Sequence, residues 1–202
     1  MLRESAKQYY RAAVIGKTLE AVLAKAGASA RCHYDAHYDV MLVPLAVAAG
    51  LGEPGRHNLL IADRFGTRVR VGAVTTDFAL SRGTPVSLGA SRFCEICRKC
   101  AESCPSRALS LGPRVDVRGV WKWPTDVERC YGYWRGVGTE CGICMAVCPY
   151  SRRSSWFHNG VRWMLTRAPW LARVAVWGDD LVYGRRWRTN TEQTRNEHET
   201  IT

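Results

Sequence analysis

Long hydrophobic runs are absent from this 202-residue sequence. No apolar stretch approaches the roughly 18 residues that a helix needs to cross a bilayer, so we expect no membrane-spanning helix. The first residues, Met1 to Ser5, are not followed by the apolar core of a secretory signal. We therefore expect a cytoplasmic protein, or one exported already folded, and no disulfide framework.

Acidic residues are scarce relative to basic ones. Eighteen Asp and Glu stand against 29 Lys and Arg, which gives a formal net charge of +11. Such an excess can attract an acidic partner, an anionic membrane surface or nucleic acid, but we favour a plain solvated surface. The sequence lacks the dense mixture of basic and aromatic residues of a nucleic-acid binder, so no nucleic-acid partner is expected. The glycine-dense loop at residues 50–57 also lacks the dinucleotide and P-loop patterns.

What the sequence does contain is cysteine: nine in all, eight of them between residues 94 and 148. The first block is Cys94-x-x-Cys97-x-x-Cys100-x-x-x-Cys104-Pro105, and the second is Cys130 followed by Cys141-x-x-Cys144-x-x-x-Cys148-Pro149. Thiolates are the usual ligands of iron-sulfur clusters. A run of three closely spaced cysteines with a fourth before a proline is the two-cluster pattern, in which the fourth cysteine binds the other cluster. The spacing therefore predicts two [4Fe-4S] clusters.

The same rule assigns four ligands to each cluster. Cluster one would be bound by Cys94, Cys97, Cys100 and Cys148, and cluster two by Cys130, Cys141, Cys144 and Cys104. We expect Cys104 to open a helix that directs its thiol away from cluster one. Cys130 is set back from the rest of its block by an insert at residues 131–140.

Structural zinc is the alternative, because paired Cys-x-x-Cys is also a zinc pattern. A third cysteine at the same short gap, and a Cys-Pro after each block, favour iron-sulfur clusters. Eight thiolates and two cluster cores would lower the net charge to about +7. The remaining cysteine, Cys32, is expected to be a packing residue.

Local patterns predict helices at residues 5–26 and 40–49, strands at 28–34, 58–62 and 67–74, and a loop-like stretch at 112–123. Ile15, Leu19 and Val22 share one face of the first helix, which predicts its buried side. Arg68 and Arg70 share the outer face of the last strand, where they would bind an anion or meet solvent. Residues 161–176 form an amphipathic basic segment that could lie on a membrane surface or pack on its own domain.

Several strings resemble the reductive dehalogenase family. They are Gly50-Leu51-Gly52-Glu53, Phe65-Gly66-Thr67-Arg68, Thr76-Asp77, the cysteine run from Phe93 to Pro105, Cys130-Tyr131-x-Tyr133-Trp134, Cys141-Gly142-Ile143-Cys144-Met145, and Asp179-Asp180 with Tyr183-Gly184-Arg185. The strings that begin at Cys130 and Cys141 distinguish this family from the related epoxyqueuosine reductases. The resemblance runs from about Tyr9 to Arg185.

The resemblance implies an α+β protein. A partial nitroreductase-like, corrinoid-binding α/β domain would occupy residues 1–88. A bacterial ferredoxin-like domain with two [4Fe-4S] clusters would occupy residues 89–155, and a helical segment and tail residues 156–202. The cofactors implied are the two clusters and cobalamin.

The resemblance also implies site residues on the corrinoid side. A proton-donating tyrosine would be Tyr9 or Tyr10, with Arg68, Arg70 or Arg56 as its basic partner. The positions expected to contact the corrinoid are Gly52, Arg56, Arg70 and Thr76.

Two functions are consistent with the sequence. The first is an oxidoreductase that removes halide from an organohalide at cobalamin, with electrons relayed through the clusters from a ferredoxin, a flavodoxin or a quinol-linked donor. The second is a two-cluster electron carrier or fragment without catalysis of its own. Residues 50–80 favour the first, since a simple carrier has no use for them. Family members are commonly longer and often begin with a twin-arginine export signal. The sequence therefore resembles their C-terminal portion, and association with a membrane surface is an open alternative.

Overall fold

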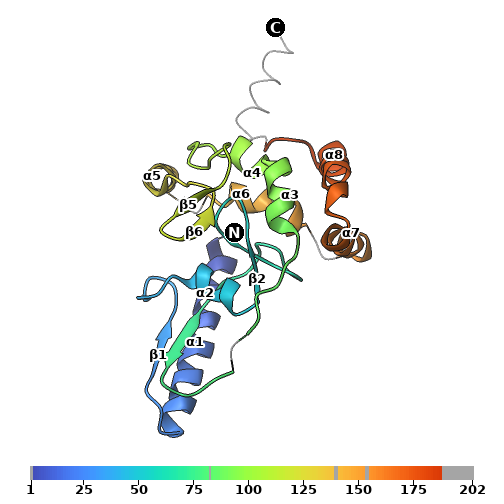
Figure 1. Ribbon diagram of the computed structural model, residues 1–202. Helices are drawn as coiled ribbons and strands as arrows, with labels where there is room; N and C mark the ends of the chain where they lie inside the picture. Colours follow the sequence, from blue (N-terminus) through green and yellow to red (C-terminus); the bar gives the residue numbers. More distant parts are fainter. Residues whose placement is uncertain (1, 82, 139–140, 153–154, 188–202) are drawn as a thin grey trace.

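The computed structural model describes residues 2–81, 83–138, 141–152 and 155–187 (Figure 1). The long helix α1 (Leu2–Lys25) extends away from the cysteine-bearing region, together with strands β1 (Ala30–His33) and β4 (Ala73–Thr76). The two strands are antiparallel, with Ala30 opposite Thr76 and His33 opposite Ala73, and α1 packs against both. The predicted helix at residues 5–26 and the predicted strand at 28–34 are confirmed, with small changes in their ends.

The side that α1 buries differs from the prediction. Ile15, Leu19 and Val22, expected to face the core, are exposed. A neighbouring side of the helix packs against the sheet at Gly16, where an added Cβ would lie 2.2 Å from the Sγ of buried Cys32. Glycine has no Cβ, so the helix backbone can lie this close to the Cys32 side chain. Close backbone packing, rather than the apolar stripe, therefore decides which face is covered.

The middle of this region is a short helix followed by a hairpin. Helix α2 (Leu42–Ala48) confirms the prediction at residues 40–49, and strand β3 (Leu60–Ala62), paired with β2 (Gly52–Pro54), confirms the one at 58–62. The predicted strand at residues 67–74 is wrong for most of its length. Only Ala73–Thr76 are extended and paired, because β1 offers backbone partners over four residues. Arg68 and Arg70 therefore do not share the face of a strand.

The cysteine blocks fold into short helices with one repeated turn. Helix α3 (Ala90–Cys97) and the single-turn helix α4 (Lys99–Glu102) are joined by Arg98, and Gly142 precedes the single-turn helix α6 (Ile143–Ala146). Arg98 and Gly142 both have left-handed backbones, with φ of 55° and 62°. Each directly follows the second cysteine of its block, so the left-handed residue has the same position in both blocks.

Cys104 does not open a helix. It follows α4 and leads into a turn, in which the Arg107 N–H donates to the Cys104 carbonyl oxygen at 3.1 Å. The residue before a proline is disfavoured in helical conformation, and Pro105 imposes that restriction here. Cys148 is likewise extended before the 3₁₀ turn η1 (Pro149–Ser151).

A hairpin precedes the second block, and a helix carries the first cysteine of that block. Helix α5 (Val127–Val137) carries Cys130 and begins at Asp126, whose side chain accepts from the Arg129 N–H at 3.0 Å. Strands β5 (Val115–Val117) and β6 (Val120–Lys122) form an antiparallel hairpin where a loop was expected. Arg118 and Gly119 both have positive φ, 56° and 80°, as the tight two-residue hairpin turn requires.

The last described segment is two helices rather than one amphipathic element. Helix α7 (Trp156–Arg167) ends before the 3₁₀ turn η2 (Pro169–Leu171), and α8 (Ala172–Tyr183) follows and packs against α3. Pro169 lacks the N–H that would continue α7, so the predicted segment at residues 161–176 breaks there. Of the helices in the described part of the chain, none has the length and apolarity to cross a membrane.

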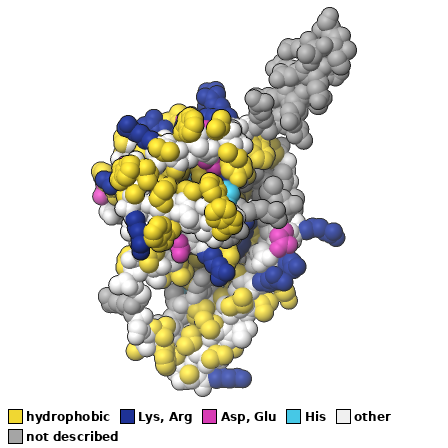
Figure 2. All heavy atoms as spheres, turned by 90° about the vertical axis from the view of Figure 1, so that its right-hand side faces the viewer, with side chains coloured by type: hydrophobic (Ala, Val, Ile, Leu, Met, Phe, Trp, Pro, Cys, Tyr) yellow, Lys and Arg dark blue, Asp and Glu magenta, His cyan; other side chains and the backbone are white. Residues whose placement is uncertain are grey.

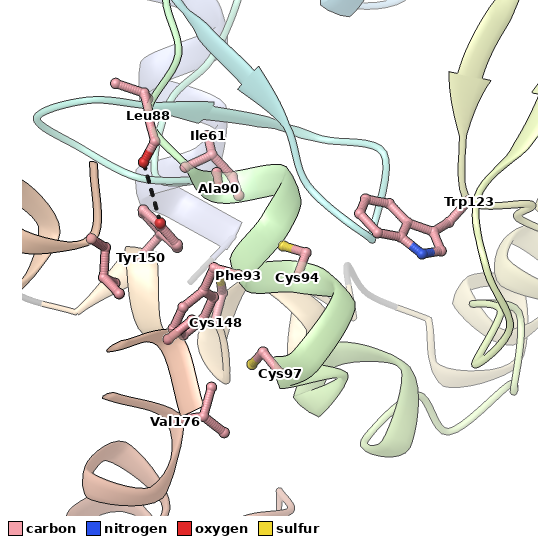
Figure 3. Packing of buried hydrophobic residues seen from close by; sticks show 12 residues of the cluster. Ile61, Leu88, Ala90, Phe93, Cys94, Cys97, Trp123, Cys148, Tyr150 and Val176 are labelled. Atoms are coloured by element: carbon pink, nitrogen blue, oxygen red, sulfur yellow. Dashed lines mark hydrogen bonds between the residues drawn. The ribbon is translucent and has the colours of Figure 1, made fainter. Parts of the chain in front are cut away.

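One hydrophobic cluster joins these elements around α3 (Figure 3). Phe93 and Cys94 of α3 pack with Ile61 of β3 and Val176 of α8. The Phe93 ring meets Tyr150 edge-on with 5.3 Å between centroids, and the Tyr150 hydroxyl donates to the Leu88 carbonyl oxygen at 3.5 Å. The residues before, within and after the cysteine blocks therefore share a core.

Candidate iron-sulfur site

Four cysteine thiols surround a cavity beside α3. Cys94, Cys97, Cys100 and Cys148 line this space, together with Arg56 and His57. Figure 3 shows Cys94 and Cys97 on α3, with Cys148 beside the same helix. Within the described residues, no three His, Cys, Asp or Glu side chains are placed to share a single metal ion. Four thiols around a cavity are instead what a multi-iron group requires.

Electrostatic coupling links the cysteines mainly within two sets. Burial is the main cause that raises their pKa values, to about 12 for Cys97 and for Cys144. Cys148 raises the pKa of Cys94, Cys97 and Cys100 further. Cys104 and Cys141 do the same for Cys130 and Cys144. Most of these couplings lie within the sets that the spacing assigns, but Cys144 of the second set also raises the pKa of Cys100. The division of the eight cysteines into two ligand sets stays a prediction.

Backbone N–H groups offset part of this effect of burial. The peptide N–H of Lys99 lowers the pKa of Cys97, and that of Met145 lowers the pKa of Cys144. At Cys148, the backbone of Tyr150 and Ser151 acts in the same direction, as does the Ser151 hydroxyl. Peptide dipoles directed at a sulfur favour its thiolate form, which is the form that binds iron. The turns after Cys97, Cys144 and Cys148 therefore favour the thiolate forms that a cationic cluster core would bind.

Two residues of the β2–β3 hairpin hold the first cysteine helix. The Glu53 carboxylate accepts from the N–H groups of Ala90 (2.6 Å) and Ser91 (3.3 Å) at the start of α3, where a negative charge is favoured. Arg56 is 2% exposed, and its Nε donates to the Cys94 carbonyl oxygen at 3.0 Å. Its Nη1 donates to the carbonyl oxygens of residues 110 and 112, at 2.7 and 3.0 Å. Arg56 therefore ties α3 to the segment that leads into β5.

A set of charged residues around the buried Lys99, which we call the Lys99 network, joins α8 to the cysteine helices. The Lys99 ammonium is 1% exposed and pairs with Asp179 and, at 3.0 Å, with Asp180. Arg152 Nε lies 3.1 Å from Asp179, and Arg185 bridges Asp180 and Glu102. The network comprises Lys99, Glu102, Arg152, Asp179, Asp180 and Arg185. Because Lys99 lies between Cys97 and Cys100, we expect the loss of these ion pairs to affect the position of the first cysteine block.

The comparisons with known proteins agree with this geometry. Residues 93–151 match the family model of a 4Fe-4S dicluster domain. The tetrachloroethene reductive dehalogenase of Sulfurospirillum multivorans is 39% identical over 150 residues, which are 70% of this chain and 30% of that protein. A solved reductive dehalogenase structure superimposes with a TM-score of 0.84 at 32% identity, over 90% of this chain and 27% of the solved one. The chain belongs to the reductive dehalogenase family.

The family and its 4Fe-4S chemistry are thus confirmed, and iron-sulfur clusters are favoured over zinc. An epoxyqueuosine reductase of Lactococcus garvieae is 32% identical over 132 residues, which are 58% of this chain. The solved epoxyqueuosine reductase of Streptococcus thermophilus superimposes with a TM-score of 0.50 at 22% identity, which shows a shared fold alone. The chain spans 30% of the S. multivorans reductive dehalogenase and 26% of that of Desulfitobacterium hafniense.

Among the residues expected on the corrinoid side, the structure brings Tyr9 and Arg70 together. The Arg70 guanidinium lies over the Tyr9 ring, 4.7 Å from its centroid, and also donates to the Ser5 hydroxyl at 2.9 Å. Tyr10 is 71% exposed. Arg68 is exposed and donates to the Arg152 carbonyl oxygen at 3.1 Å.

The other three positions expected to contact the corrinoid have contacts within the chain. Gly52 lies in β2, where an added Cβ would be 2.1 Å from the Ile61 carbonyl oxygen. Thr76 ends β4, and its hydroxyl accepts from the Phe78 N–H at 3.1 Å. Arg56 donates to the carbonyl oxygens described above. A contact of any of them with a corrinoid stays a prediction.

Neither the place of His57 at the cysteine cavity nor the ion pairs of the Lys99 network were identified from the sequence. His57 follows Arg56 in the glycine-dense loop, and the sequence pattern gave no sign that it lines the cysteine cavity. For the network there was a signal: a lysine inside a cysteine loop and a distant Asp-Asp pair both belong to the strings that resemble the family. The sequence did not indicate that the lysine and the Asp-Asp pair form ion pairs with each other in the folded chain.

A surface of exposed aromatic side chains covers α7, η2 and α8. Trp156, Trp163, Trp170 and Trp177 recur every seven residues, and all four are exposed. Figure 2 shows hydrophobic side chains gathered on the upper part of this face, with basic ones among them. The exposed charged residues in 155–187 are the arginines Arg167, Arg173 and Arg186, whereas Asp179 and Asp180 are partly buried in the Lys99 network. We call this set of tryptophans and arginines the tryptophan surface.

Proposed function

We propose that this chain is the cluster-bearing part of a corrinoid-dependent reductive dehalogenase. The observation that carries the proposal is the 39% identity to a tetrachloroethene reductive dehalogenase over 150 residues, together with the match of residues 93–151 to a 4Fe-4S dicluster domain. Cys94, Cys97, Cys100 and Cys148 would bind cluster one, and Cys130, Cys141, Cys144 and Cys104 cluster two. The clusters would pass electrons from a donor such as a ferredoxin, a flavodoxin or a quinol-linked protein.

The reaction would consume two electrons and one proton. The carbon–halogen bond breaks, a carbon–hydrogen bond forms, and halide leaves. When bound, the cobalt of the corrinoid supplies the reductive cleavage, while the protein supplies position, electrons and the proton. The relatives are named for tetrachloroethene and trichloroethene, so small chlorinated alkenes are the first organohalides to test.

Tyr9 is our candidate for the proton donor, with Arg70 as its basic partner. A guanidinium over the ring would offset the negative charge that the phenol oxygen acquires when it releases a proton. Tyr10 and Arg68, the other residues considered for these roles, lie exposed without this pairing. Residues 1–88 would form part of a nitroreductase-like corrinoid domain, with Gly52, Arg56, Arg70 and Thr76 near the corrinoid. The clusters would lie within residues 89–155.

Metal content and halide release test this proposal. Anaerobic expression with hydroxocobalamin is expected to give about eight iron atoms and about one cobalt per chain, with chloride released from tetrachloroethene under a viologen reductant. Tyr9→Phe is expected to lower the release rate about 100-fold or more, since positioned proton transfer contributes at least that much. Tyr10→Phe is the matched control and should leave the rate nearly unchanged.

The outcomes separate the two candidate functions. Iron without cobalt or chloride release would reject the dehalogenase proposal and favour the electron carrier. Equal rates for the two tyrosine variants would exclude Tyr9 as the proton donor.

We further propose that the tryptophan surface docks on an anionic bilayer. Tryptophan is favoured at the boundary between headgroups and acyl chains, and the exposed arginines, with no exposed carboxylate in this segment, match anionic lipid in charge. Co-sedimentation with vesicles that contain phosphatidylglycerol is expected to exceed that with neutral vesicles. The double variant Trp163→Ser/Trp177→Ser should lower binding roughly tenfold or more, at about 1.5–3 kcal/mol per large apolar side chain.

Trp121→Ser is the matched control, because Trp121 is equally exposed but lies on the β5–β6 hairpin. Binding that neither lipid charge nor the double variant changes would exclude this surface as the membrane contact.

A further inference from the structure

His57 occupies a special position in the cluster-one cavity. It is 5% exposed and lines the same space as Cys94, Cys97, Cys100 and Cys148. Its Nδ1 accepts a hydrogen bond from the Leu59 N–H at 3.1 Å, so Nδ1 carries a lone pair and not a proton. The proton of the neutral ring therefore lies on Nε2.

The Nε2–H group has no hydrogen-bond partner among the described protein groups, although it is fully buried. A buried donor without a partner costs about 1–3 kcal/mol, so such a group in a native protein calls for an explanation. The ring has little freedom to turn elsewhere. An added Cβ on Gly55 would lie 2.5 Å from the ring carbon Cε1 and 2.9 Å from Ile61 Cδ1. His57 is thus held between the hairpin and the cavity.

We propose that His57 Nε2–H donates a hydrogen bond to a sulfur of cluster one and thereby raises the reduction potential of that cluster. The inference rests on the proposed ligand set and adds a tuning residue to it. Hydrogen bonds to the sulfurs are among the factors that set cluster potentials. Reduction adds one negative charge to the cluster, and a donor directed at a sulfur stabilises the more negative state. His57 acts through the cluster and is a positioning residue, not a catalytic one.

The test is a potentiometric titration of the clusters followed by electron paramagnetic resonance on the anaerobic protein. His57→Leu is expected to shift the equilibrium between oxidised and reduced cluster one about tenfold toward the oxidised form. This equals a potential lower by about 59 mV for a one-electron couple. The potential of cluster two should not change. His57→Gln, which keeps an N–H donor, should recover part of the shift.

His33→Leu is the matched control. His33 is a buried histidine outside the cavity, with Nε2 2.9 Å from the Thr75 hydroxyl, and its loss should move neither potential. A second measurement counts the exchangeable protons coupled to reduced cluster one. The unsubstituted protein should show one such coupling beyond those of the backbone N–H groups at Cys97 and Cys148, and His57→Leu should lack it.

The outcomes distinguish this inference from the proposed function. Unsubstituted protein without iron-sulfur clusters would refute the ligand sets themselves. Both clusters present, with the same potentials in His57→Leu, would overturn the role of His57 alone. Loss of cluster one from the Leu and Gln variants alike would also overturn it, because His57 would then hold the cavity together and not tune the cluster.

Discussion

Cys97→Ser is expected to halve the iron content, from about eight to about four atoms per chain, and to remove one of the two cluster signals. Cys97 lines the cavity with Cys94, Cys100 and Cys148. Burial raises the pKa of Cys97, and the nearby Cys148 thiol raises it further. Cluster two draws its proposed ligands from Cys104 and from the second block, so its signal should persist. Iron analysis and electron paramagnetic resonance of the reduced protein measure both effects.

Cys32→Ser provides the control for the loss of a buried cysteine. Cys32 packs against Gly16 of α1, far along the chain from both blocks, and its substitution should leave the iron content and both signals unchanged. If Cys97→Ser lost neither signal, or both equally, the division of the eight cysteines into these two sets would be wrong.

Asp179→Asn is expected to destabilise the protein by about 3 kcal/mol, the lower end of the range for breaking a buried ion pair from one side, because Lys99 still pairs with Asp180. The substitution deprives two cations of a partner: Lys99, which is 1% exposed, and Arg152, whose Nε lies 3.1 Å from the carboxylate. For a chain of this size, the loss corresponds to a melting temperature lower by roughly 10 °C. Thermal unfolding of the cluster-loaded protein under anaerobic conditions measures it.

Asp39→Asn makes the same chemical change in an exposed pair. Asp39 pairs with Arg31, and both side chains are more than half exposed, so the cost should stay within about 1 kcal/mol. Similar losses in the two variants would mean that the Lys99 network does not fasten α8 to the cysteine helices.

Some elements could be predicted from short stretches, and others could not. The helix at residues 5–26 was predictable because its residues are good helix formers over a long span, but not the face it buries, which Gly16 and Cys32 decide. The strand at 67–74 was overestimated because the length of a strand depends on its partner, and β1 provides four residues. The β5–β6 hairpin was missed although Arg118-Gly119 between alternating valines is a hairpin signal, because only three residues pair on each side.

The sequence by itself determined the family and the 4Fe-4S chemistry. Two-residue gaps between cysteines, and the prolines that follow Cys104 and Cys148, are local features, and the backbone turns at Arg98 and Gly142 follow from positions within the blocks. The tertiary structure alone decided that Arg70 stacks on Tyr9 and that His57 faces the cysteine cavity. It also joined Lys99 to Asp179 across 80 positions of the chain. Such contacts depend on how separate elements pack together, and no local spacing encodes that packing.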